Sequence, residues 1–189
     1  MLNYSRRLLL ASALGALGAC AQTPPDQPDL LVQTATIQDI MDAIIDPSAD
    51  FLFEAVAMVA DERGVTERAP QTDDEWREVR RRAIQLLEAP NLLAMRGRQV
   101  ARVDDAADRP EVELPPDEIQ ALIEADWTAY TDRARDLQTA AALAVRASDA
   151  RDKDALFRAN ERIDRACENC HLRFWYPNDA RAREAAGQN

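Results

Sequence analysis

The chain has 189 residues, with 23 Lys or Arg against 34 Asp or Glu and a formal net charge of −11. An acidic surface of this kind disfavours binding to nucleic acid or to anionic lipid and favours a partner with a basic patch, although solubility alone explains the charge equally well. The length and the lack of linker signals predict one domain with its own hydrophobic core.

Residues 1–19 have the pattern of an export signal. Arg6 and Arg7 precede an apolar run that is shorter than the ~20 residues needed to cross a bilayer as a helix. The segment Leu17-Gly18-Ala19-Cys20 resembles a bacterial lipoprotein site, in which Cys20 receives a lipid and becomes the N-terminus. Removal of residues 1–19 takes away two arginines and no acids, so the net charge changes from −11 to −13. The proline-rich residues 20–34 then predict a short tether.

Two stripes of apolar residues at helical spacing predict a first, interrupted helix. The first stripe consists of Ile37, Ile40, Met41 and Ile44. The second consists of Leu52, Ala55, Val56 and Val59. Asp46-Pro47 lies between them, and because proline is tolerated at the start of a helix but not inside it, Asp46 is expected to cap a new segment. Gly64 is expected to end that segment.

Thr72 and Glu75 have the spacing of a capping box and open a further helix. The inward residues of this helix are Trp76, Val79, Ala83 and Leu86. Pro90 is expected to strain or end its last turns. Residues 97–114 show no helical stripe and contain many aspartates, which predicts a long surface loop.

Pro115-Pro116-Asp117-Glu118 starts a long helix that is expected to run to about Arg146. Its inward residues are Ile119, Leu122, Ile123, Tyr130, Leu137 and Ala141. A last helix has an inner face made of Leu156, Asn160, Ile163, Cys167, Cys170, His171 and Phe174. Pro177-Asn178 ends it, and residues 179–189 form a polar tail. No segment alternates for long enough to form a sheet, so the pattern predicts an all-α, four-helix bundle over residues 35–178 with the motif below on its C-terminal helix.

The chemistry is concentrated in Cys167-Glu168-Asn169-Cys170-His171. C-x-x-C-H is the pattern by which a haem is attached through two thioethers, and on a helix the two thiols and the imidazole share one face. The chain has three cysteines and one histidine, and that histidine directly follows the two thiols. A thioredoxin-like dithiol is expected in a βαβ context, whereas the pattern around this motif is helical. A closed zinc site needs four Cys or His ligands, and only three are present in this motif, so both alternatives are disfavoured. A solvent-exposed accident is the third alternative.

An export signal, four expected helices and a single C-x-x-C-H near the C-terminus resemble the cytochrome c prime family and its low-spin relatives. The resemblance is architectural, and it implies one covalently attached haem c, held by Cys167 and Cys170 inside a bundle. It further implies that His171 is the proximal iron ligand and that the first helix contributes the distal position. Phe174 keeps the aromatic that follows the motif in the family and is expected to wall the haem. Trp175 replaces the family's arginine, for which Arg173 or Arg162 is expected to compensate.

The sixth iron ligand decides between two functions. Bis-histidine ligation is excluded within one chain, so the candidates are Met41, Met58 and Met95. Met41 is favoured because it lies on the inward stripe of the first helix, although an ordinary role in the core stays open. A methionine ligand suits electron transfer, whereas a vacant or displaceable position suits binding of NO or CO.

The sequence therefore predicts a periplasmic, lipid-anchored, monohaem c-type cytochrome acting in electron transfer. The alternatives are a gas-binding haem protein and a lipoprotein whose haem only stabilises the bundle. The expected partners are a redox protein with a basic patch and the membrane, through Cys20; nucleic acid is not expected, and a homodimer stays open. Ala21 lacks the aspartate that signals inner-membrane retention in some bacteria, which favours the outer membrane. No nucleophile has a histidine to spare, so the chain is not expected to be an enzyme.

Overall fold

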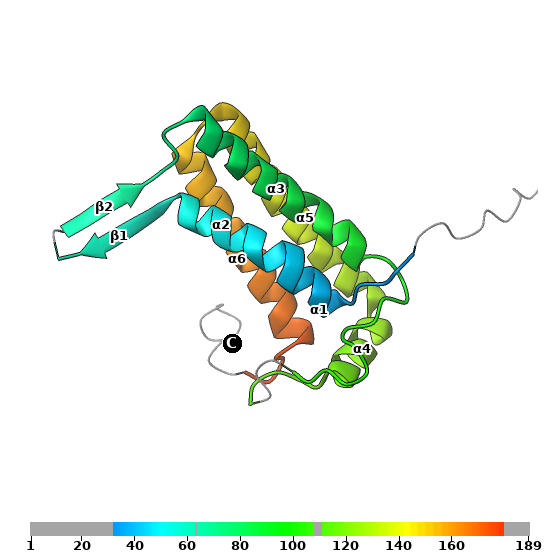
Figure 1. Ribbon diagram of the computed structural model, residues 1–189. Coiled ribbons are helices and arrows are strands. Elements are labelled where there is room, and N and C mark those ends of the chain that lie inside the picture. Colours follow the sequence, from blue (N-terminus) through cyan, green and yellow to red (C-terminus); the bar gives the residue numbers. More distant parts are fainter. Residues whose placement is uncertain (1–31, 63, 108–110, 180–189) are drawn as a thin grey trace, which may run out of the picture. The chain divides into compact units, whose positions relative to one another are not determined.

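The computed structural model describes residues 32–62, 64–107 and 111–179 (Figure 1). The expected export signal at 1–19, the lipidated Cys20, the tether up to residue 31 and the tail from residue 180 lie outside the described residues. The described residues are mostly helical, with one two-stranded antiparallel sheet. The helical class predicted from periodicity is confirmed, and the expectation that no segment forms a sheet is wrong.

The first helical rod consists of α1 (Ile37–Ile40), a π-helical turn η1 (Met41–Ile45) and α2 (Asp46–Ala55). A capping box starts it: the Thr36 hydroxyl accepts the Asp39 N–H at 3.0 Å, and the Asp39 carboxylate accepts the Thr36 N–H at 2.9 Å. These bonds satisfy backbone donors that have no partner within the helix.

The predicted interruption at Asp46-Pro47 is a local widening of this rod. In the π-helical turn, the N–H of Asp46 bonds to the carbonyl of Met41, five residues back. The prediction that Asp46 caps a new segment is wrong, because the residue before α2 is Ile45, which makes no capping hydrogen bond. Pro47 is accommodated in the first turn of α2, where its missing N–H costs little.

A β-hairpin replaces the expected end of the first helix. β1 (Ala57–Asp61) pairs antiparallel with β2 (Gly64–Arg68). The helix ends because Val56 has extended geometry, with φ −133° and ψ 111°. Gly64 opens β2 at φ +124°, a conformation that L side chains rarely adopt. The helical prediction for Val59 is therefore wrong, since this residue lies in a strand that leaves the core.

α3 (Asp73–Leu93) begins at the predicted capping box, in which the Thr72 hydroxyl accepts the Glu75 N–H at 3.2 Å. The four residues predicted to face inward are buried: Trp76, Val79, Ala83 and Leu86. Pro90 does not end the helix but lies buried in its last turns. The following residues, 94–115, contain no helix or strand where they are described. Arg98 and Val100 in this loop are buried, so it is only partly the surface loop that was expected.

The single helix expected from residue 115 onward is two helices, α4 (Pro116–Ala125) and α5 (Trp127–Ala150). Asp126 leaves helical geometry, with φ −136° and ψ 63°, and its carboxylate accepts the Ala129 N–H at 3.0 Å. This side-chain bond competes with the helical backbone bonds and starts α5 as a cap, which is the reason for the break. Leu122, expected to face inward, is 37% exposed on α4.

The long helices enclose one hydrophobic core: α3 packs on α5, α5 packs on the last helix, α6 (Lys153–Phe174), and α2 contacts both α3 and α6 (Figure 1). The 94–115 loop joins the ends of two of these helical segments. The Ile37 N–H donates to Gln99 O at 2.9 Å, and the Leu114 N–H donates to Trp175 O at 2.8 Å. Among the described residues, no helix combines the length and apolarity that crossing a membrane requires.

Candidate functional site

α6 carries the Cys-x-x-Cys-His motif in its C-terminal turns. Asp152 caps the start of this helix by accepting the Ala155 N–H at 2.8 Å, and the helix then continues without interruption through the motif. Helical spacing places Cys167, Cys170 and His171 on one face. All three side chains are partly buried, and both cysteines pack against the hydrophobic core.

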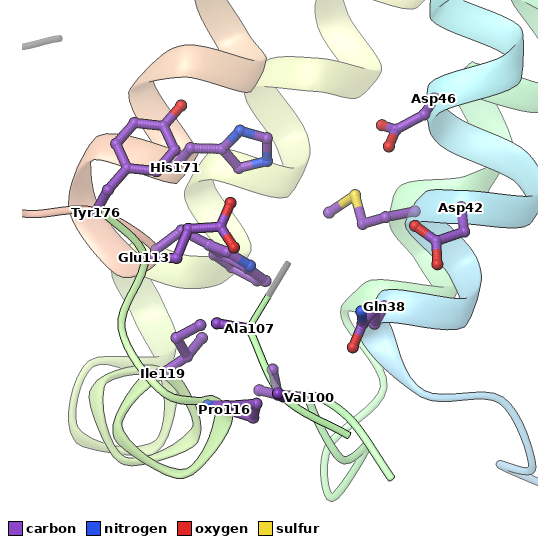
Figure 2. Close-up of a pocket in the computed structure, with 13 residues that line it drawn as sticks. Gln38, Asp42, Asp46, Val100, Ala107, Glu113, Pro116, Ile119, His171 and Tyr176 are labelled. Carbon is purple, nitrogen blue, oxygen red and sulfur yellow. The ribbon is translucent and has the colours of Figure 1, made fainter. Parts of the chain in front are cut away.

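Two adjoining cavities face this motif. The larger, of about 280 Å³, lies in front of His171, between the first helical rod and the 94–115 loop. The smaller, of about 50 Å³, lies beside the two thiols, where α5 faces α6. Met41, Asp46 and His171 line both cavities, which therefore meet at these residues. Figure 2 shows His171 on one side of the larger cavity and Asp42 and Asp46 on the opposite side.

The two thiols lie in surroundings that disfavour a charged sulfur. Burial raises the pKa of both Cys167 and Cys170 to about 12, and the Asp46 carboxylate adds to the effect at Cys167. Free sulfurs in these places are protonated at neutral pH, whereas a reactive dithiol needs a stabilised thiolate. The surroundings therefore suit neutral sulfur, as in a thioether, better than redox cycling between thiol and disulfide.

The three candidate methionine ligands lie in different surroundings. Met41, in the π-helical turn, lines both cavities together with His171. Met58 is 63% exposed on β1. The sulfur of Met95 accepts a hydrogen bond from Arg98 Nη2 at 3.2 Å. The fold thus brings Met41, and neither of the other two, to the cavity in front of the imidazole.

Phe174 lines neither of these two cavities but packs behind the wall of the smaller one. It is buried and meets the ring of Tyr130 edge-on, with ring centroids 5.6 Å apart. Tyr130 itself lines the smaller cavity. Trp175 and Tyr176 line the larger cavity, with ring centroids 5.7 and 5.8 Å from that of His171.

The two arginines expected to compensate for Trp175 lie on the exposed side of α6. Arg162 is exposed, and Arg173 pairs with Asp126 at 2.5 Å, which joins the end of α6 to the start of α5. The Ala129 N–H, and after it Arg173, hold the pKa of the Asp126 carboxyl below its ordinary value. Neither arginine lines the two cavities.

Arg133 on α5 is the arginine that lines the smaller cavity, and sequence reasoning passes it over. Its Nε–H and the hydroxyl of Tyr130 are buried without a hydrogen-bond partner. The two residues are three positions apart and therefore share a helix face. The signal that could have found Arg133 is its place beside the inward stripe formed by Tyr130 and Leu137. The surface that lines the smaller cavity is almost entirely apolar, so this cavity suits an apolar part of a ligand.

These features fit a c-type haem. The porphyrin would supply four nitrogen ligands to the iron, so the chain would need to supply only the axial ones. Among the described residues, no group of three His, Cys, Asp or Glu is arranged to hold a bare metal ion. A haem site does not need such a group. Comparisons of the chain with protein-family models, with curated proteins and with solved structures gave no match.

Proposed function

We propose that the protein is a monohaem c-type cytochrome that transfers electrons. Its fold in this proposal is a four-helix bundle, in which the rod at 37–55 and helices α3, α5 and α6 are the four members. The observation that carries the proposal is that Cys167 and Cys170 line the smaller cavity, while His171 and Met41 line both this cavity and the larger one beside it. Two thiols, one imidazole and one thioether are the protein groups that such a haem requires.

Each of these residues has a distinct role in the proposal. Cys167 and Cys170 would hold the porphyrin through thioethers, His171 would be the proximal ligand and Met41 would be the distal ligand. When bound, the haem supplies a one-electron iron couple whose potential depends on the axial ligands and on burial. Phe174 would not contact the haem directly; it packs on Tyr130, which lines the smaller cavity.

Backbone hydrogen bonds hold the two helical segments that carry the proposed iron ligands. The helix with His171 is tied to the 94–115 loop where Leu114 bonds to Trp175, and the rod with Met41 is tied to the same loop where Ile37 bonds to Gln99. Both proposed ligands thus lie on helical segments with an end that hydrogen-bonds to a described part of the loop, Gln99 in one case and Leu114 in the other. Ligands that keep their positions favour electron transfer over exchange of the distal ligand.

The proposed location follows from the N-terminal pattern. Export by residues 1–19 and lipidation of Cys20 would hold the domain at a membrane on the periplasmic side, with the outer membrane favoured by Ala21. The acidic charge suits a redox partner with a basic patch at low salt. Sedimentation of the holoprotein measures whether it forms a homodimer.

Absorbance and electron paramagnetic resonance of the holoprotein, matured in a periplasm with c-type haem attachment, test the proposal. We expect a six-coordinate, low-spin spectrum in the wild type and a high-spin spectrum in Met41→Ala. Met58→Ala is the matched control, because Met58 is exposed on the hairpin, and it should leave the spectrum unchanged. A five-coordinate wild type that readily binds NO or CO would contradict electron transfer and favour the gas-binding alternative.

A further inference from the structure

We propose that a stripe of arginines along α6, behind the two thiols, is the docking surface for a redox protein that presents an acidic patch. The inference rests on the proposed function, because it requires a haem that exchanges one electron with this partner. It goes beyond that function, since the net charge of the chain points only to a basic partner, whereas an electron carrier needs both an electron donor and an electron acceptor.

The charged side chains of α6 are sorted by sign around the helix. At 3.6 residues per turn, four arginines and one asparagine fall within a sector of about 80°. The four arginines are exposed. The acids in the same part of the helix, Glu161, Asp164 and Glu168, fall in a separate sector. The arginine stripe consists of Arg158, Arg162, Arg165, Asn169 and Arg173.

This arginine stripe borders two surface hollows on the side of α6 that faces α5. The first hollow, of about 200 Å³, is lined by Arg162 and Arg165 and by Leu143 of α5. The second, of about 420 Å³, is lined by Arg173 and by residues of α4 and α5. Asn169 lines both hollows, so together they form one groove along the stripe.

The groove lies close behind the two thiols. Ala166 lines both the smaller cavity and the first hollow, and Arg133 lines both the smaller cavity and the second hollow. Asn169 itself lies between the two cysteines of the motif. A single layer of side chains therefore separates the thiol side of the cavity from the groove. Because electron transfer slows steeply with distance, a partner seated in the groove is well placed to exchange an electron with the proposed haem.

The groove is positive although the chain is acidic. Its charged lining consists of four arginines and two aspartates, whereas the net charge of the chain is −11. The two aspartates are neutralised within the protein, in the pairs Arg133–Asp136 and Arg173–Asp126. Among the described residues, no ion pair or side-chain hydrogen bond occupies Arg162 or Arg165. These two guanidinium groups are therefore available to an external acceptor.

Charge complementarity identifies the partner. Arginine forms strong, charge-assisted hydrogen bonds with carboxylates and is enriched in protein interfaces. Leu122, which is 37% exposed, and the partly buried Leu143 add apolar contact area to the groove. The larger cavity, in front of His171, has the opposite character, because the charged groups in its described lining besides the imidazole are carboxylates. The two sides of the proposed haem thus suit partners of opposite charge.

Stopped-flow oxidation of the reduced holoprotein tests the inference with two probes of opposite charge. Ferricyanide, an anion, and tris(phenanthroline)cobalt(III), a cation, each take one electron from the ferrous haem. The double variant Arg162→Gln, Arg165→Gln should slow oxidation by ferricyanide by about tenfold at about 0.01 M ionic strength, because two positive charges no longer attract the anion. It should not slow oxidation by the cobalt complex, and the effect on ferricyanide should vanish at about 1 M salt.

The matched control is Arg77→Gln, Arg81→Gln on α3. These side chains are 67% and 71% exposed and line neither hollow, and their replacement changes the net charge by the same amount. We expect the rate with ferricyanide to fall by about twofold at most, because the charges are far from the groove. Arg162→Lys, Arg165→Lys keeps both charges and should retain most of the wild-type rate.

Binding of dye-labelled poly-L-glutamate, followed by fluorescence anisotropy at low salt, tests the surface with a probe that resembles an acidic protein patch. We expect the wild-type holoprotein to bind it in spite of its own negative charge. The Arg162→Gln, Arg165→Gln variant should bind about tenfold more weakly, and the α3 control should bind within about twofold of the wild type.

Equal slowing of ferricyanide in the groove and α3 variants would show that only net charge matters and would overturn the inference, as would a wild type that does not bind poly-L-glutamate. Displacement of poly-L-glutamate by inorganic phosphate at equal charge would overturn it in favour of a small-anion site. A wild-type dimer that dissociates in the groove variant would overturn it in favour of a second copy of the chain. Each of these results in a haem-loaded protein leaves the proposed function standing, whereas a wild-type chain without covalent haem would refute both.

Discussion

Asn160 on α6 joins this helix to the rod that carries Met41. Its amide Nδ2 donates to Leu52 O on α2 at 2.6 Å, and the two residues are 7% and 0% exposed. Leu52 lies in the last turn of α2, where backbone carbonyls lack partners because the chain leaves the helix after Ala55. The Asn160 side chain thus satisfies a carbonyl that neither helix nor water would satisfy.

The cost of removing this bond follows from its burial. In Asn160→Ala the carbonyl of Leu52 is left buried and unpaired, which costs about 1–3 kcal/mol. Part of the cost is offset, because Asn160 Oδ1 is itself buried without a partner and is removed with the side chain. We expect the free energy of unfolding to fall by about 1–2 kcal/mol, or about 2–8 °C in Tm for a domain of this size.

Urea and thermal unfolding of the holoprotein, followed by far-ultraviolet circular dichroism, measure this loss. The visible spectrum of the folded variant should be unchanged, because Asn160 lines neither cavity. Asn91→Ala is the matched control: Asn91 is exposed on α3, where its side chain donates to Glu88 and accepts from Gln138, each at 2.8 Å. Because both bonds are exposed to solvent, its loss should cost less than about 0.5 kcal/mol. Equal destabilisation of the two variants would refute the reasoning.

Three further predictions concern other parts of the fold. The lowered pKa of Asp126 means that its ionised form stabilises the protein above the ordinary value of 3.8 and that this contribution is lost as pH falls through the folded value. The stability difference between wild type and Asp126→Asn in urea unfolding should therefore shrink on acidification, and a growing difference would contradict the pairing. Thr72→Ala removes the cap of α3 and should lower the free energy of unfolding by about 0.5–2 kcal/mol, whereas an unchanged urea midpoint would show that the cap is unimportant. Deletion of the exposed Ala43 should turn the π-helical turn into a regular helix and rotate Met41 by about 100° relative to α2. The low-spin spectrum should then be lost, and its retention would rule out Met41 as the ligand.

Elements with local start signals and a one-sided apolar stripe are predictable from this sequence. α3 is the best case, because its capping box and its stripe lie within the same few turns. The hairpin is not predictable in this way: β2 is exposed along its whole length, so it has no alternation of buried and exposed residues, and Val59 extends the preceding helical stripe by coincidence. The break at Asp126 is hidden for a similar reason, since the stripe continues across it from Ile123 to Tyr130.

In the candidate site, too, the residues in a local sequence pattern are predictable and the others are not. The shared position of Cys167, Cys170 and His171 can be predicted because residues at this spacing lie on one face of any helix. Met41 follows from its stripe and from the family resemblance, but the π-helical turn that carries it has no sequence pattern of its own. Arg133 is missed because an arginine beside an apolar stripe resembles a solvated residue. Only the packing of α5 against α6 shows that Arg133 lines the smaller cavity and that its Nε–H is buried.

The intact mass of the chain, produced in a periplasm that attaches c-type haem, tests the central claim most directly. We expect the mass to exceed that of the polypeptide by one haem and the added group to map to the peptide with Cys167 and Cys170. The double variant Cys167→Ala, Cys170→Ala should lack the added mass. A colourless wild-type product with both thiols free would contradict the account.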